Sequence, residues 1–361
     1  MSDQPTKTPW TPAAPAPLVS VHNEWDPLEE IIVGTAVGAC TPRGDIAYDF
    51  MASRGGQRPL PPVGLYPEQV IEQTQEDLEE LVALLRQANV RVRRARAHEP
   101  MRVIRTPDWE ATEFYAYCPR DILLAIGTTI IETPSFMRSR HFEALAYRHL
   151  LLEYLGSGAR WISAPPPRLS EEHFDTTRGP EHFLPEVEPV FDAANVLRIG
   201  RDVLYLVSIS GNKTGAAWLK STLGPEYRVH LLEGLYTSVH VDSTIVPLRP
   251  GLVLLNPERV SPSQVPSIFA GWDVLYAPEM VEYAYSDLMP HSSKWLGINL
   301  LMITPSLAFV DSHQVPLMKL LSSHGIECVP IRLRHGRPLA GGVHCVTLDV
   351  RRRGILEDYR T

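Results

Sequence analysis

One unit of secondary structure recurs along the chain, and this repetition constrains the fold more than any other feature. Each copy has an apolar strand, a turn, an amphipathic helix that often ends at a glycine, and a second strand. The clearest copies predict strands at 202–209, 227–232, 252–255, 273–276, 307–311 and 326–333, and helices at 215–223, 263–270 and 316–324. Looser copies predict strands at 30–34, 90–94, 121–131 and 159–163, and helices at 67–88 and 141–155.

Five such units cannot each bury an apolar face alone, so they must pack against one another. A ring of five is a closed solution that leaves no sheet edge exposed, and an open α/β sheet is the alternative. The chain has no Gly-x-Gly-x-x-Gly after its first strand and no Gly-x-x-x-x-Gly-Lys-Ser/Thr, which argues against a dinucleotide fold and a phosphate-cradling loop. The repeat therefore favours a single closed α/β domain.

The ends of the chain and its loops differ from this pattern. Residues 1–18 contain five prolines among Thr, Ala and Lys, which predicts a disordered leader followed by a folded domain at 19–361. The Pro-rich stretch 165–189 predicts a long surface loop.

Composition excludes several classes of partner. The net charge is −8, so no basic surface is available for nucleic acid, and no stretch has the length or apolarity of a membrane helix or a signal peptide. We expect a cytoplasmic protein whose partners are small molecules; a homodimer is an open expectation. The chain has four cysteines and no Cys-x-x-Cys pair, which predicts reduced thiols rather than a disulfide framework or a zinc site.

Polar residues gather at the ends of the repeated units, where a ring would direct them towards a common centre. Four segments qualify: 191–195, 240–244, 290–295 and 341–345. In the last of them Cys345 follows the pair Gly341-Gly342, which would let the backbone approach a ligand closely. Most single cysteines are buried apolar residues, and we interpret the others in that way: Cys40, Cys118 and Cys328.

A thiol nucleophile needs a partner, because its ordinary pKa of about 8.5 leaves little thiolate at neutral pH. His240 is the best candidate, since His240 and Asp242 lie on one face of an extended segment. A metal site would need further ligands at suitable spacing, and none is identified. A hydrogen-bonded core histidine is the alternative for His240, and it is the interpretation given to most of the other histidines, His344 included.

Two aspartates lie where a buried carboxylate is costly unless it is paired. Asp192 lies among Phe191, Ala193 and Ala194, and Asp121 precedes an apolar strand. Each alone could be a helix cap or a turn residue. Several carboxylates converging on one cysteine and one histidine suit a planar cation, and a guanidinium is the planar cation that carboxylates hold in pairs of hydrogen bonds.

These residues occur in segments that resemble the amidinotransferases that use arginine as donor. The similarity runs from Val19 to about Tyr359 and is carried by residues 23–30, 106–110, 118–121, 188–194, 240–242, 247–251, 292–295, 344–345 and 349–352. The resemblance implies a pentein-like α/β-propeller of five modules, with no metal and no organic cofactor.

The resemblance also implies roles for individual residues. Cys345 would be the nucleophile, His240 the acid and base, and Asp192 the carboxylate that completes the triad. The guanidinium would be held by Asp121 and Asp242. The amino-acid end of arginine would be held by Arg259, Ser292 and Ser293.

The implied activity is transfer of the amidino group of L-arginine through an amidino-cysteine to an amine, with release of ornithine. The expected acceptor is an inosamine phosphate or a related amine of antibiotic biosynthesis; glycine is the alternative, since Ser292-Ser293-Lys294-Trp295 looks more like the glycine branch. An arginine deiminase-like hydrolase and a non-enzymatic binding protein are alternatives of other classes. A phosphorylated acceptor would need a basic patch, for which Arg332, Arg334, His335 and Arg337 are candidates unless they form a solvated face.

Overall fold

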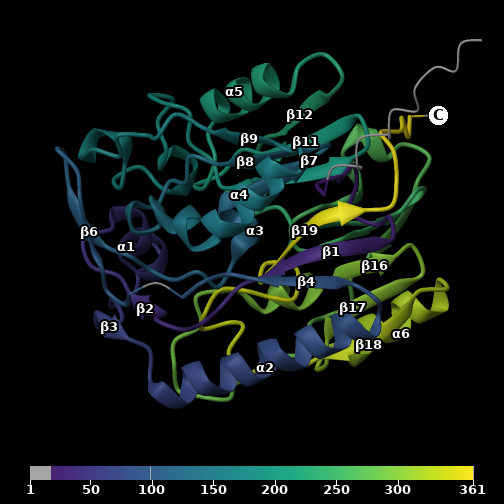
Figure 1. Cartoon of the computed structure of the whole chain (residues 1–361), viewed down its shortest axis with the longest axis horizontal. Helices are drawn as coiled ribbons and strands as arrows, with labels where there is room; N and C mark the ends of the chain where they lie inside the picture. Colours follow the sequence, from purple (N-terminus) through teal and green to yellow (C-terminus); the bar gives the residue numbers. More distant parts are fainter. Residues whose placement is uncertain (1–17, 98, 361) are drawn as a thin grey trace, which may run out of the picture.

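Five three-stranded sheets of one design organise residues 18–97 and 99–360, the part of the chain that the computed structural model describes (Figure 1). In each sheet the middle strand pairs antiparallel with one neighbour and parallel with the other. The first sheet joins the two ends of the described chain, because β1 (Leu28–Val33) lies between β19 (Thr347–Arg352) and β4 (Arg91–Arg94).

The other four sheets follow one another along the chain. Their strands are β7 (Leu123–Ile126), β8 (Thr129–Glu132) and β9 (Arg160–Ser163); β10 (Val196–Ile199), β11 (Asp202–Leu206) and β12 (Arg228–Leu232); β13 (Ile245–Arg249), β14 (Leu252–Leu255) and β15 (Asp273–Tyr276); and β16 (Leu301–Thr304), β17 (Leu307–Asp311) and β18 (Glu327–Ile331). Two short pairs lie outside these sheets: β2 (Cys40–Thr41) with β3 (Gly64–Leu65), and β5 (Val103–Arg105) with β6 (Glu110–Thr112).

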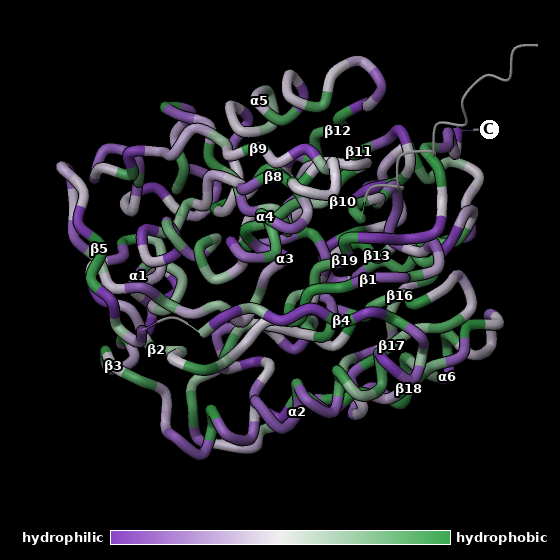
Figure 2. Tube along the Cα trace, in the orientation of Figure 1, coloured by the Kyte–Doolittle hydropathy of each residue, from purple (hydrophilic) through white to green (hydrophobic). Residues whose placement is uncertain are grey.

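The parallel pair of each sheet is the repeated unit that the sequence predicts. Helices connect four of these pairs: α2 (Glu68–Gln87), α4 (Arg148–Gly156), α5 (Lys213–Leu223) and α6 (Val315–Ser323). Helix α2 is amphipathic, with apolar and polar residues alternating along it in Figure 2, and its apolar side is buried. Helices α2 and α5 lie at opposite edges of the molecule in Figure 1.

Two predicted elements are wrong. The helix expected at 263–270 is replaced by two 3₁₀ turns, Pro262–Gln264 and Ser267–Phe269, because Pro266 has no N–H to donate inside a helix. The strand expected at 121–131 is a short helix, α3 (Pro119–Ile122), followed by the β7–β8 hairpin. Gly127 makes the hairpin turn with a φ of 55°, a conformation that glycine adopts without strain.

The first strand of each sheet has a place that the repeat did not predict. By first strand we mean the strand of each sheet that pairs antiparallel with the middle strand. A polar segment comes before each of them in the sequence: 118–121 before β7, 191–195 before β10, 240–244 before β13, 290–295 before β16 and 341–345 before β19. The segments before β10 and β16 contain 3₁₀ turns, η5 (Ala193–Asn195) and η8 (Lys294–Ile298). Equivalent positions in the five sheets therefore carry the candidate chemistry.

The remaining elements connect these sheets. Helix α1 (Ile46–Ala52) and the 3₁₀ turns Arg138–Arg140, Glu143–Tyr147, Glu171–His173 and Pro180–His182 lie in loops. No helix in residues 18–97 and 99–360 is long and apolar enough to cross a membrane. The leader predicted at 1–18 lies outside the described residues except for Leu18, and the start of the domain at 19 stays a prediction.

Candidate active site

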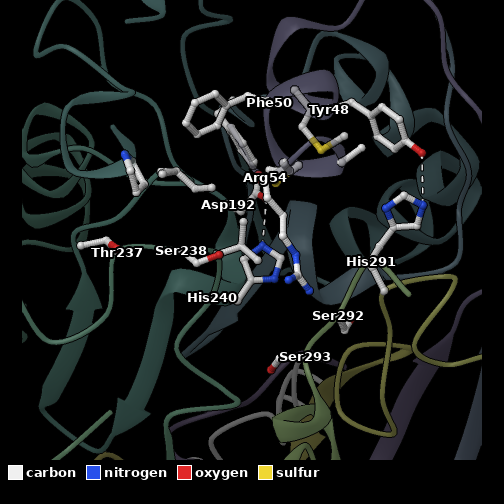
Figure 3. A pocket seen from close by; sticks show the side chains of 18 of the residues that line it. Tyr48, Phe50, Arg54, Asp192, Thr237, Ser238, His240, His291, Ser292 and Ser293 are labelled. Atoms are coloured by element: carbon white, nitrogen blue, oxygen red, sulfur yellow. Dashed lines mark hydrogen bonds and ion pairs between the residues drawn. The ribbon is translucent and has the colours of Figure 1, made fainter. Parts of the chain in front are cut away.

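All the residues predicted for the site line one cavity of about 610 Å³ (Figure 3). They come from segments far apart in the sequence, and all but Arg259 belong to the polar segments named above. Arg259 follows β14 and reaches the segment 240–244 through its hydrogen bonds to Ser243 and Thr244. The structure places these residues on the cavity wall: Asp121, Asp192, His240, Asp242, Arg259, Ser292, Ser293 and Cys345. The loop predicted at 165–189 forms part of the wall through Thr176, Thr177, Gly179 and Pro180.

His240 lies between two carboxylates. Its Nε2 donates to Asp192 Oδ2 at 3.0 Å, and its Nδ1 faces Asp121 Oδ1 at 3.6 Å. Burial lowers the pKa of His240, but the charges of Asp121 and Asp192, with a smaller effect of Asp242, outweigh it and raise that pKa to about 9. The imidazole is therefore a cation at neutral pH and can donate a proton.

Two carboxylate oxygens at this site are buried and accept no hydrogen bond. They are Asp121 Oδ1 and Asp192 Oδ1. A buried acceptor without a donor costs about 1–3 kcal/mol or more when it is charged, so such atoms mark a place where a ligand supplies the donor. Because both oxygens belong to cavity residues, the expected ligand is a cation with several N–H groups.

Cys345 is buried with 3% of its surface exposed, and its Sγ lies 3.5 Å from Asp242 Oδ2. Burial, followed by the nearby carboxylate of Asp242, raises the pKa of the Cys345 thiol well above its usual range. The residue is thus a neutral thiol while the cavity holds no cation. Burial raises the pKa of Asp242, but the hydrogen bond and charge of His344, together with the charge of His240, outweigh it and lower this pKa to about 2, so Asp242 is ionised.

The glycine pair before Cys345 has a packing role rather than the ligand-approach role that the sequence suggested. A Cβ on Gly342 would lie 2.6 Å from Asn299 Oδ1, and one on Gly341 would lie 2.6 Å from Cys118 Sγ. Asn299 Oδ1 accepts the backbone N–H groups of His344 and Cys345, both at 3.0 Å. The glycines allow the chain to approach Asn299, and Asn299 then fixes the position of the thiol.

Arg140 supports Asp121 and was not predicted from the sequence. It is buried, and its Nη1 donates to Asp121 Oδ2 at 2.6 Å while its Nε and Nη2 hold both oxygens of Glu143. This pairing orients Asp121 so that its other oxygen is left for the cavity. Only the fold brings Arg140 to Asp121, so no local pattern could have identified it.

His344 was interpreted as a core histidine, but it connects the site to a buried network of charges. Its Nδ1 donates to Asp242 Oδ2 at 2.9 Å, and its Nε2 faces Glu24 Oε2 at 3.5 Å. Glu24 accepts from Arg198, which also donates to Asp349. His344 therefore positions Asp242 from behind, and its place directly before Cys345 was the one available sequence signal.

Arg259 lies on another part of the wall. Its Nη1 donates to Ser243 and Thr244, its Nη2 donates to Ser293 Oγ at 3.1 Å, and its guanidinium lies 3.7 Å from the ring centroid of Tyr236. Ser292 lines the cavity beside Ser293. No carboxylate forms an ion pair with Arg259 among the described residues, so its charge is available to an anionic group of a ligand.

The four candidate residues for a basic phosphate patch, Arg332, Arg334, His335 and Arg337, do not line the cavity. Arg332 and Arg334 bind acidic residues of helix α2, including Asp77, and His335 hydrogen-bonds Gln73. Arg337 pairs with Glu282. The charges of Arg332 and Arg334 are neutralised by carboxylates of helix α2, and the charge of Arg337 is neutralised by Glu282.

The arrangement can hold a planar cation against a thiol, with an imidazolium alongside to protonate a leaving group. In the described part of the chain, no group of three or more His, Cys, Asp or Glu residues could hold a metal ion. The four cysteines are free thiols in the structure.

The chain is similar to several known proteins, although no family model matches it. Inosamine-phosphate amidinotransferase 1 of Streptomyces glaucescens is 52% identical, over 95% of this chain and 99% of that protein. The L-arginine:L-lysine amidinotransferase of Pseudomonas savastanoi pv. phaseolicola is 37% identical, over 94% of this chain and 96% of that one. The solved structure of an inosamine-phosphate amidinotransferase from Streptomyces griseus superposes with a TM-score of 0.92 at 51% identity, covering 96% of this chain and all of the other.

Proposed function

The chain belongs to the amidinotransferase family, and from this premise we propose that it transfers the amidino group of L-arginine, through a covalent adduct on Cys345, to an inosamine phosphate. Within this reaction Cys345 is the nucleophile, His240 the acid and base, and Asp192 the carboxylate that keeps His240 charged. The observation that carries the proposal is the convergence of three buried carboxylates on one buried thiol, with Asp121 Oδ1 and Asp192 Oδ1 lacking donors.

The donor binds as a cation between carboxylates. Asp121 and Asp242 accept N–H groups of the guanidinium and fix its plane against Cys345 Sγ. Arg259 and Ser293, with Ser292 beside them, bind the α-carboxylate of arginine.

Binding of this cation also activates the thiol. In the free cavity burial and Asp242 hold the pKa of Cys345 high, but a guanidinium in contact with sulfur supplies the positive charge that the thiolate requires. The thiol proton then leaves to solvent through the open end of the cavity, where the exposed residue Arg54 lies. The nucleophile therefore forms only when its substrate is in place.

The first half of the reaction releases ornithine. The Cys345 thiolate attacks the central guanidinium carbon, a C–S bond forms, and the bond from that carbon to the side-chain nitrogen of ornithine breaks as His240 protonates this nitrogen. The amidino group remains on sulfur and His240 becomes neutral.

The second half reverses these steps with another amine. The acceptor nitrogen loses a proton to the neutral His240 and attacks the amidino carbon, and the C–S bond breaks to return the thiolate. His240 is again a cation, ready for the next arginine.

The acceptor assignment rests on similarity and on the cavity. The relative from Streptomyces glaucescens named for inosamine phosphate is 52% identical to this chain, against 37% for the one named for lysine. The segment that looked like the glycine branch contributes only Ser292 and Ser293 to the cavity. Lys294 pairs with Glu258 and Glu279, and Trp295 Nε1 donates to Glu258, so these two side chains serve the fold rather than acceptor choice.

We also propose that the five sheets close into the ring of an α/β-propeller. Strand β19 contacts β7 and β1 contacts β16, so the sheet built from both chain ends lies between the second and fifth sheets. Continuous apolar clusters join the second sheet to the third, and the third to the fourth and fifth. A crystal structure without the β1–β16 contact would contradict closure.

Mass spectrometry of the protein incubated with L-arginine alone tests the function. We expect one amidino group on Cys345 and an equivalent of ornithine, and we expect neither from Cys345→Ala. Cys328→Ala is the matched control, because Cys328 lies in β18 away from the cavity and should keep the adduct. Citrulline as the product would indicate hydrolysis instead, and the absence of any adduct would refute the covalent step.

The expected cytoplasmic location and the expected homodimer stay predictions. Light scattering of the purified protein tests the dimer directly, since a mass near that of one 40.4 kDa chain would exclude it.

A further inference from the structure

A cationic group of side chains at the cavity has no part in the reaction described so far. The cations are Arg54 and Arg58, which follow helix α1; His291 lies beside them, and all three residues line the cavity. Arg54 is exposed and Arg58 is half-buried, whereas Cys345 is almost fully enclosed, so the group belongs to the open end. In Figure 3 Arg54 is seen between Phe50 and His240, and His291 is seen above Ser292.

Neither of these arginines has an ion pair with a carboxylate in the part of the chain that the structure describes. The two other arginines of the cavity differ, since Arg140 is held by Asp121 and Glu143 and Arg259 is held by serine and threonine oxygens. Among the described residues that line the cavity, the acidic ones are Asp121, Asp192 and Asp242, which surround the thiol and His240. The open end thus carries positive charge that the protein does not neutralise.

The backbone fixes this charge in position. The N–H of Arg58 donates to Ser53 O at 3.0 Å, its Nε donates to Ala52 O at 2.6 Å, and its Nη2 donates to Pro290 O at 3.4 Å. Its Nη1 has no hydrogen-bond partner among residues 18–97 and 99–360. Arg54 has no side-chain hydrogen bond in the structure, and its φ of 51° places it in a tight turn after α1. Carbonyl groups hold the guanidinium of Arg58 without cancelling its charge.

The positive potential acts on neighbouring groups. Burial, and then the charge of Arg54, lower the pKa of Arg58. Burial, and then the charge of Arg58, lower the pKa of His291 to about 4, so His291 is neutral at physiological pH. Two adjacent cations that repel one another at the edge of a cavity are stabilised when an anion binds between them.

We propose that Arg54 and Arg58 form the subsite for the phosphate of the acceptor. This inference rests on the proposed function and adds the residues that select a phosphorylated amine. In glycine, the alternative acceptor, the carboxylate is one carbon from the reacting amine. It would therefore have to lie beside Cys345, where the acidic residues of the cavity wall would repel it. An anion bound at the open end must be separated from that amine by a spacer such as a ring, and planar guanidinium groups bind phosphate oxygens in pairs.

The experiment compares two acceptors in one variant, so that a general loss of activity cancels. With L-arginine as donor, kcat/KM is measured for inosamine phosphate and for unphosphorylated inosamine, and the ratio of the two is the readout. Arg54→Gln is the principal variant, because Arg54 makes no side-chain hydrogen bond that its loss would disturb. Arg160→Gln is the matched control, since Arg160 is exposed in β9 and lies outside the cavity.

We expect Arg54→Gln to lower the ratio about 10- to 100-fold, the range for loss of a charged hydrogen bond, and Arg160→Gln to leave it unchanged. Inorganic phosphate should compete with inosamine phosphate in the unmodified enzyme and should compete more weakly after Arg54→Gln with Arg58→Gln. The subsite is overturned if the ratio is unchanged in Arg54→Gln and in the double variant. It is also overturned if inorganic phosphate competes equally well in the double variant and in the unmodified enzyme. Failure of the proposed function is distinct, because arginine alone would then leave no amidino group on Cys345.

Discussion

Replacing Asp192 by Asn should lower the pKa of His240 and leave the shape of the site intact. The pKa of His240 rises from 6.5 to about 9 in the folded protein, which corresponds to roughly 3 kcal/mol in favour of the protonated imidazole. A charge-assisted hydrogen bond such as the one to Asp192 contributes about 1.5–3 kcal/mol. We therefore expect the pKa to fall by about 1–2 units, with Asp121 retaining the remainder.

The measurement is an NMR titration of labelled histidine between pH 5.5 and 10, with the His240 signal assigned by its loss in His240→Gln. Asp202→Asn is the matched control, because Asp202 pairs with His230 at 2.6 Å and lies away from the cavity. This control should leave the His240 titration unchanged. A pKa of His240 that stays within about half a unit of its original value in Asp192→Asn would refute the assigned role of Asp192.

The same change has a consequence for stability. The folded-state pKa of His240 lies above the unfolded value, so its pairing stabilises the protein fully below about pH 6.5 and the contribution is lost as the pH rises through about 9. The difference in unfolding free energy between the original protein and Asp192→Asn should therefore shrink by about 1.5–3 kcal/mol from pH 6 to pH 10. Urea denaturation at the two pH values measures it.

Three further substitutions test other parts of the site. Asp121→Asn should raise the KM for arginine about 10- to 100-fold in steady-state kinetics, because it removes the buried charge that we propose binds the guanidinium. Gly342→Ala should lower the free energy of unfolding by about 1–3 kcal/mol and slow adduct formation, because its Cβ would lie 2.6 Å from Asn299 Oδ1. His344→Gln removes the hydrogen bond that lowers the pKa of Asp242 to about 2, so this pKa rises and the acid limb of the rate of adduct formation moves to higher pH.

Two of these substitutions have a control within the chain. Gly156→Ala at the end of α4 meets no atom within 4 Å and should leave stability unchanged or slightly higher. Asp108→Asn removes an aspartate paired with Arg168 outside the cavity and should leave the KM for arginine within about twofold. Equal effects of Asp108→Asn and Asp121→Asn would contradict the assignment of the guanidinium site, and an acid limb that His344→Gln does not move would contradict the positioning role of His344.

The parallel pair of each sheet could be predicted because apolar periodicity defines it locally. Strands β14 and β17 begin and end where the sequence places them. Two of the antiparallel strands, β10 and β13, were missed, and each contains a residue that looks unsuitable in a strand: Arg198 in β10 and Pro247 in β13. Arg198 is tolerated because Glu24 and Asp349, distant in sequence, neutralise it, and Pro247 is tolerated because β13 is an edge strand.

The residues of the site also fall into those that could be predicted from the local sequence and those that could not. Asp121, Asp192 and His240 stood out because a polar residue beside an apolar strand is locally unusual, and the structure brings them to one cavity. Arg140 and Arg54 gave no such signal in the sequence. Arg140 is important because it binds the carboxylate of Asp121, and Arg54 because no carboxylate pairs with it in the described part of the chain. The surroundings of these two arginines depend on the tertiary structure and cannot be predicted from the local sequence.

The pairing of β19 with β1 sets the order in which this enzyme becomes active. Cys345 immediately precedes β19, and β19 is held by a strand from the other end of the described chain. While the protein is being synthesised, the segments that carry Asp192 and His240 emerge from the ribosome well before the thiol does. The proposed active centre is therefore assembled last, by a pairing that bridges almost the full length of the polypeptide, and an N-terminal fragment that ends before residue 345 lacks the proposed nucleophile.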